Sequence, residues 1–274
     1  MSEIVITAEA PLGSGGWGEL VANRHLLANL IRREARLPYL NMSFGVVWAL
    51  VRALIFSFVF FFIRRAASAD MKTDVAYPLY VYSGVTLWWY FVDAATGATS
   101  SIFKDAGLIT KVYYPRAISP AAPVVARLTE FGIQAMMFPV GMLLFGHGPD
   151  WRLLLLPLVV VHVMVLALAV GLFVAALAVR RQDYMAVQRY VLYIGMFLSP
   201  VIYAPDLWGT TGTVLYFLLN PMAAPLQMFR ACLFGGVHAP WAGWGLSAAV
   251  TLAFLTLSYR QFRRQEAGLG DAVL

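Results

Sequence analysis

Four charged side chains lie inside stretches of this sequence that are otherwise apolar, namely Arg52, Asp93, Arg127 and Glu130. An unpaired charge in hydrocarbon costs about 2.5–3.5 kcal/mol or more, so each of them needs a partner or a function. Arg127, Glu130 and Gln134 follow i, i+3, i+7 spacing, which places them on one face of a helix. Two hypotheses remain open: ion pairs within or between helices, or arginines that face a path and bind an anionic group such as a phosphate.

Aromatic residues are dense in "LWWYFVD", residues 87–93. Flat aromatic faces that also carry O–H and N–H groups suit stacking on sugar rings, although plain packing would use the same residues. The sequence therefore offers these candidates for lining a substrate channel: Trp88, Trp89, Tyr90, Phe91, Arg52 and Arg127.

Motifs for common catalytic chemistry are missing from the 274 residues. The sequence contains no G-x-x-x-x-G-K-[ST] phosphate loop and no H-E-x-x-H motif. Its single cysteine and four scattered histidines do not follow metal-ligand spacing. We therefore expect a protein that is not an enzyme and holds no cofactor or metal of its own.

The composition is that of a membrane protein. Hydrophobic residues make up 61% of the chain and charged residues only 12%, against about a quarter in soluble domains. The mean hydropathy is +0.72. So much apolar surface indicates an all-α integral membrane protein. The net charge of +6 then marks a cytoplasmic face rather than a nucleic-acid site.

Six segments are predicted to cross the membrane, each near the roughly 20 residues that a crossing needs. The fifth is short for a crossing, and the third is interrupted by three prolines. The predicted spans are residues 43–63, 77–99, 118–145, 151–179, 190–204 and 241–259.

The basic residues predict the orientation. Thirteen of the 20 fall in segments that share one side if both termini are cytosolic. Arg64 and Arg65, on the opposite side, are the main exception. The predicted inner set is Arg24, Arg32, Arg33, Arg36, Lys104, Lys111, Arg116, Arg180, Arg181, Arg189, Arg260, Arg263 and Arg264.

Two further segments are predicted to lie at the membrane surfaces. Residues 19–37, "ELVANRHLLANLIRREARL", carry one apolar stripe and basic residues elsewhere, which is typical of an interfacial helix. Residues 205–240 contain apolar pieces too short to cross, broken by prolines, and predict two re-entrant outer helices. Residues 1–18 are expected to be a flexible cytosolic N-terminus, and residues 19–274 a single transmembrane domain.

Residues 100–120, "SSIFKDAGLITKVYYPRAISP", interrupt the apolar pattern on the predicted cytosolic side, and we call them the coupling segment. Leu108 and Ile109 accompany Lys104, Lys111 and Arg116, so a short helix there would be apolar on one side and basic at its ends. Such a helix could dock on a membrane or in a groove of a soluble partner. Because this chain has no ATP site, a separate ATPase is the partner that would make mechanical sense.

Four blocks in the same order resemble the permease subunits of ABC transporters that export bacterial surface polysaccharides. They are "NLIRREARLPYLNMSFGVVW", "YPLYVYSGVTLWWYF" with the coupling segment, "ALAVRRQDYMAVQRYVLYIGMFLSPVIYAP" and "LLNPMAAPLQMFRACLFG". The resemblance runs from about residue 20 to the end. It implies a homodimer in the bacterial inner membrane, with two ABC nucleotide-binding subunits that hold ATP and Mg²⁺. It also implies a lipid-linked polysaccharide, such as an O antigen, as cargo.

By the same resemblance, the coupling segment would transmit movement from the ATPase, and the connection near residue 183 would add a smaller contact. Capsule, teichoic acid, and small lipids or drugs are alternative cargoes. An ion-coupled carrier and an enzyme of polysaccharide assembly are alternatives from other classes. The residues implied in ATPase coupling are Lys104, Leu108, Ile109, Lys111, Tyr113, Pro115, Arg116, Arg181, Asp183 and Arg189.

Overall fold

The computed structural model describes residues 23–36, 45–66, 75–105, 107, 116–148, 150–204, 209–234 and 237–265, and within these ranges all regular structure is helical. The all-α prediction is therefore confirmed. The helices are α2 (Arg24–Arg36), α3 (Gly45–Ala66), α4 (Tyr77–Lys104), α6 (Ile118–Ala126), α7 (Leu128–Ala135), α8 (Met137–Phe145), η2 (Trp151–Leu155), α9 (Leu156–Ala178), α10 (Asp183–Leu198), α11 (Gly209–Leu219), α12 (Ala223–Leu233) and α13 (Trp241–Gln265).

Four helical segments in the described part of the chain are long and apolar enough to cross a membrane. They are Val47–Ala66, Ile118–Phe145, Trp151–Ala178 and Trp241–Gln265, and each coincides with a predicted span. The two other predicted spans correspond to α4 and α10. Helix α4 has 28 residues, about 42 Å, but it is more polar, whereas α10 has 16 residues, about 24 Å. The count of six spans therefore remains a prediction.

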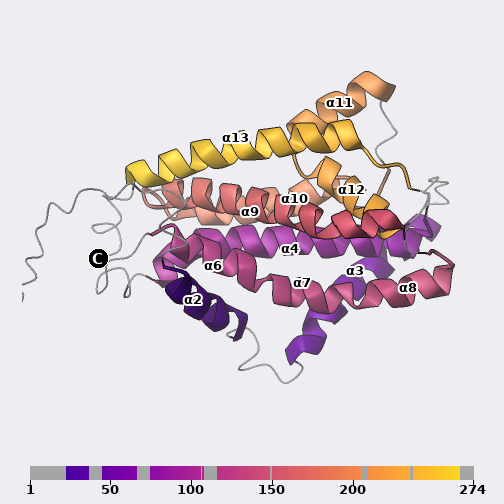
Figure 1. Cartoon of the computed structure of the whole chain (residues 1–274), viewed down its shortest axis with the longest axis horizontal. Coiled ribbons are helices and arrows are strands. Elements are labelled where there is room, and N and C mark those ends of the chain that lie inside the picture. The colour runs from indigo at the N-terminus through magenta and orange to yellow at the C-terminus, as the bar shows by residue number, and fades with distance from the viewer. Residues whose placement is uncertain are drawn as a thin grey trace, which may run out of the picture.

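Helix α4 forms the centre of the bundle, with α9 on one side and α6 and α7 on the other (Figure 1). Nearly all its side chains are buried, as expected of a helix surrounded by protein. Small residues let its neighbours approach: a Cβ added to Gly171 of α9 would lie 2.4 Å from the Cβ of Ala98. At the same crossing, the Thr99 hydroxyl donates to the Gly171 carbonyl at 3.3 Å.

The predicted span 118–145 is a run of three short helices, α6, α7 and α8, separated at Arg127 and Met136. Both residues keep right-handed helical φ and ψ angles, so the run continues in one direction (Figure 1). Prolines within the run each remove an amide donor from the backbone, which favours such an interrupted rod. The rod lies along α4 and places Arg127 at the junction between α6 and α7.

A buried histidine joins α9 to α13. The Trp244 indole donates to His162 Nδ1 at 2.9 Å, so the proton of a neutral imidazole must be on Nε2. Nε2 then donates to Thr251 Oγ1 at 3.0 Å. His162 is thus a helix-interface residue.

The two ends of the molecule are formed by different helices. Helix α2 lies at the same end as the C-terminal ends of α4 and α13, whereas α11 and α12 lie at the other end (Figure 1). The apolar side of α2 packs on α6, where Leu30, Ile118 and Ala122 form one buried hydrophobic cluster. Arg33 of α2 forms an ion pair with the buried Asp105, which follows α4. The predicted interfacial helix is therefore a helix, fixed to protein along its apolar side.

Candidate functional site

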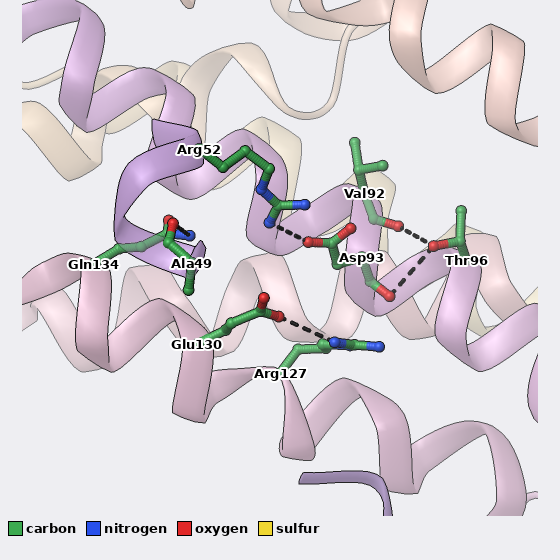
Figure 2. A network of polar contacts seen from close by, with 8 residues as sticks. All are labelled: Ala49, Arg52, Val92, Asp93, Thr96, Arg127, Glu130 and Gln134. Atoms are coloured by element: carbon green, nitrogen blue, oxygen red, sulfur yellow. Dashed lines mark hydrogen bonds and ion pairs between the residues drawn. The ribbon is translucent and has the colours of Figure 1, made fainter. Parts of the chain in front are cut away.

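The charges inside the apolar segments form two ion pairs (Figure 2). Arg52 of α3 donates through Nη2 to Asp93 Oδ2 of α4 at 2.5 Å. Arg127 Nη1 donates to Glu130 Oε2 at 3.0 Å, one helical turn along. The ion-pair hypothesis is confirmed, and the first pair also joins two helices. Pairing lowers the cost of placing these charges among apolar helices.

Gln134 completes the polar stripe that the sequence predicted on residues 127–134. Its side chain is buried, and Nε2 donates to the Ala49 carbonyl at 3.1 Å (Figure 2). Its own backbone carbonyl accepts from the Tyr82 hydroxyl at 2.8 Å. The stripe therefore faces α3 and α4. Between the stripe and the Arg52–Asp93 pair, only a small gap of about 10 Å³ remains.

A larger polar cleft adjoins this network and has a volume of about 350 Å³. One wall is α4, where Thr96, Ser100 and Lys104 repeat every four residues, and the opposite wall is formed by residues 185–193 of α10. Arg127 at the α6–α7 junction and Asp93 belong to both the network and the cleft. The lining is Val92, Asp93, Thr96, Gly97, Thr99, Ser100, Lys104, Arg127, Met185, Gln188, Arg189 and Tyr193.

The four aromatic channel candidates, Trp88, Trp89, Tyr90 and Phe91, are all buried within this one chain. The Arg52 guanidinium lies 4.8 Å from the centre of the Trp89 ring, and Tyr193 of α10 meets that ring edge-on at 5.8 Å. The Tyr90 hydroxyl donates to a backbone carbonyl of α6 at 3.1 Å. This placement is the one that plain packing predicts. A channel role stays a prediction and would require α3 and α10 to move away from α4.

Arg230 is a structurally important residue that the sequence analysis did not single out. It lies on α12, is fully buried, and has no ion pair within the described ranges. Its guanidinium donates to the carbonyls of Pro200 at 2.7 Å and Val201 at 2.8 Å. It also lies 3.5 Å from the centre of the Tyr80 ring. Arg230 thus fixes α12 to α4 and to the end of α10.

Residues 25–234, about three quarters of the chain, match the family of ABC-2 type transporters. The chain belongs to this family.

Three curated relatives carry the name "O-antigen export system permease protein RfbA". The relative from Myxococcus xanthus is 25% identical over 218 residues, which cover 79% of this chain and 83% of that protein. Two relatives from Klebsiella pneumoniae are 21% and 20% identical over 217 and 219 residues, each covering 77% of this chain and 81% of the relative. The resemblance read from the four sequence blocks is therefore confirmed.

In this ABC-2 type transporter, the candidates for ATPase coupling fall into two groups. Lys104, Arg181, Asp183 and Arg189 are exposed, and Arg116 is partly exposed. Lys104, Arg116, Arg181 and Asp183 lie at or beside the ends of α4, α6, α9 and α10, and Arg189 lies further along α10. These helix ends are on the side of the molecule where α2 lies (Figure 1). The remaining candidates, Leu108, Ile109, Lys111, Tyr113 and Pro115, lie outside the described residues.

The polar cleft of the ABC-2 type transporter brings together residues that the sequence had separated into different roles. Lys104 and Arg189 were coupling candidates and Arg127 was a channel candidate, yet all three line one cleft. Gln188, Thr96 and Ser100 were missed. The four-residue spacing of Thr96, Ser100 and Lys104 was visible in the sequence, but nothing in it indicated that α10 would cover that face.

Proposed function

We propose that this chain is the membrane subunit of an ATP-driven exporter that moves a lipid-linked polysaccharide of the O-antigen type across the bacterial inner membrane. The observation that carries the proposal is the likeness to three O-antigen export permeases over more than three quarters of the chain. The ABC-2 type transporter match over residues 25–234 supports it.

The ATP-hydrolysing subunit of this exporter would be a separate ABC ATPase that binds ATP and Mg²⁺. The 274 residues contain no phosphate loop, so hydrolysis must occur on a partner. Two permease chains would pair and two ATPase subunits would dock at the end of the molecule that holds α2. Closure of the ATPase on ATP would shift the permease toward a state with an open path.

The distribution of charge and the positions of the helix ends support docking of the ATPase at the end of the molecule that holds α2. Helix α2 and the described coupling candidates all lie at one end, and most predicted inner basic residues belong to these segments. An excess of Lys and Arg is typical of cytosolic segments, so both termini would be cytosolic. The ion pair between Arg33 and Asp105 would hold the start of the coupling segment against α2.

A transport assay with reconstituted vesicles tests the proposal. Vesicles that contain the permease and its partner ABC ATPase should translocate lipid-linked polysaccharide only when ATP is present. Translocation without any ATPase would overturn the proposal in favour of an ion-coupled carrier. ATP-dependent transport of only a small lipid or drug would favour that alternative cargo.

The coupling role has its own test in the Ile109→Asp variant. A carboxylate in place of this apolar residue should disrupt the docking contact, reducing ATP-dependent export at least about tenfold while the permease still folds. Leu219→Asp is the matched control, because Leu219 is 77% exposed on α11 at the other end. Export by Ile109→Asp at the level of the control would count against the docking site.

A further inference from the structure

The polar cleft between α4 and α10 has the donors of an anion site and is too large for a water or a single small ion. Its volume of about 350 Å³ is near the lower limit for small-molecule sites, and a water in the liquid occupies only about 30 Å³. The cleft opens beside Lys104 and Arg189, which are both exposed, and reaches inward to Arg127.

Gln188 supplies the most specific sign of a ligand. Its side chain is only 5% exposed, yet its Nε2 has no hydrogen-bond partner in the part of the chain that the structure describes. A buried amide donor without a partner is costly, and such groups are rare in folded proteins. Gln188 lines the cleft, so an acceptor bound there would satisfy it.

The charges of the cleft favour an anion. Asp93 and Arg127 are already neutralised by Arg52 and Glu130 (Figure 2). Lys104 and Arg189 have no ion pair within the described ranges, so the cleft retains two uncompensated positive charges.

Two hydroxyls on the α4 wall of the cleft already donate to backbone carbonyls of their own helix. The Thr96 hydroxyl donates to the Val92 carbonyl at 2.7 Å, and the Ser100 hydroxyl donates to the Gly97 carbonyl at 3.2 Å. The ammonium of Lys104, the guanidinium of Arg189 and the amide nitrogen of Gln188 have no hydrogen-bond partner within the described residues, and the Tyr193 hydroxyl also lines the cleft. Guanidinium and ammonium groups are the usual ligands of phosphate oxygens.

We propose that this cleft binds the phosphate or diphosphate headgroup of a lipid. One source of that group is the diphosphate of a polyprenyl-linked cargo, and for this source the inference rests on the proposed function. The other source is an anionic phospholipid of the bilayer. Either headgroup would reach the cleft from the end at which α2 lies, and its oxygens would accept from Lys104, Arg189 and Gln188.

Binding to the purified permease alone, measured by isothermal titration calorimetry in detergent, tests the site. The probes are farnesyl diphosphate, farnesol and dihexanoyl phosphatidylglycerol. Farnesyl diphosphate should bind and farnesol should not, because the phosphates carry the recognition. Phosphatidylglycerol that binds as tightly and competes would assign the site to bilayer phospholipid, whereas weak binding would assign it to the diphosphate carrier. The site is overturned if neither phosphate ester binds.

Substitutions locate the binding in the cleft. Lys104→Gln and Arg189→Gln should each weaken binding about tenfold or more, since each removes a charged donor. Arg180→Gln is the matched control, because Arg180 is exposed at the end of α9 and does not line the cleft. Equal affinity in all three variants would overturn the assignment to this cleft.

Gln188→Leu gives a second readout that a structural role would not produce. It should raise the melting temperature of the unliganded permease, because an unpartnered buried amide is removed, and it should weaken binding severalfold. Unchanged affinity in this variant would contradict the role of the amide. None of these measurements needs the ATPase, so failed transport and failed binding are separate results.

Discussion

At the scale of residues, this protein handles buried charge in two ways. Arg52 and Asp93 neutralise each other across two helices, at 2.5 Å. Arg230 instead donates to backbone carbonyls at the ends of other elements and lies against the Tyr80 ring. A charge satisfied by carbonyls fixes the positions of several backbone segments at once, whereas an ion pair fixes one helix relative to another.

The pair between Arg52 and Asp93 can be tested by a double-mutant cycle. Arg52→Met leaves a partly buried carboxylate unpaired and should lower the free energy of unfolding by about 1–3 kcal/mol. Adding Asp93→Asn removes the orphaned charge, so the double variant should recover most of that loss. Thermal unfolding in detergent measures both effects.

The control for this cycle is Arg260→Met, which removes an exposed arginine of α13 and should change stability little. A double variant that is less stable than either single variant would contradict the pairing. Transport by a stable double variant at the normal rate would also show that Arg52 is not needed to bind the cargo.

At the scale of elements, the sequence predicted well what depends on length and apolar content. Helices α3, α9 and α13 fall within or close to their predicted spans because an uninterrupted apolar run is a local property. The amphipathic stripe of α2 was predicted for the same reason. The cleft could not be predicted, because it depends on which face of α4 is covered by α10, and their residues are some 90 positions apart.

The crossing of α4 and α9 depends on a glycine that sequence alone did not single out. Gly171→Ala should destabilise the fold by about 1–3 kcal/mol, because the new methyl would lie 2.4 Å from the Ala98 Cβ and 3.2 Å from the Ala95 carbonyl oxygen. Gly245→Ala on α13 is the matched control, since an added Cβ there meets no atom of the described residues within 4 Å. Equal melting temperatures for the two variants would contradict tight packing at Gly171.

At the scale of the whole molecule, the exposed surfaces of α10 and α13 differ in a way that bears on assembly. Helix α10 exposes Tyr184, Tyr190 and Tyr193 among apolar side chains, whereas α13 exposes aliphatic residues such as Leu252 and Leu257. Hydrocarbon cannot hydrogen-bond a tyrosine hydroxyl, so a face rich in tyrosine is better placed against protein or water than against lipid. We therefore expect α10 to face the second copy of the chain in the proposed homodimer.

Cysteine cross-linking in membranes tests this arrangement, and the chain suits it because it has a single cysteine, Cys232, which is buried. In the Cys232→Ala background, Tyr190→Cys should give a dimer-sized band with a short bismaleimide, because this residue is 68% exposed on α10. Leu257→Cys, 62% exposed on α13, should remain monomeric under the same conditions. The reverse pattern would place α13 at the dimer interface, and α10 would then face lipid with its hydroxyls unpaired, against the physical argument made for it.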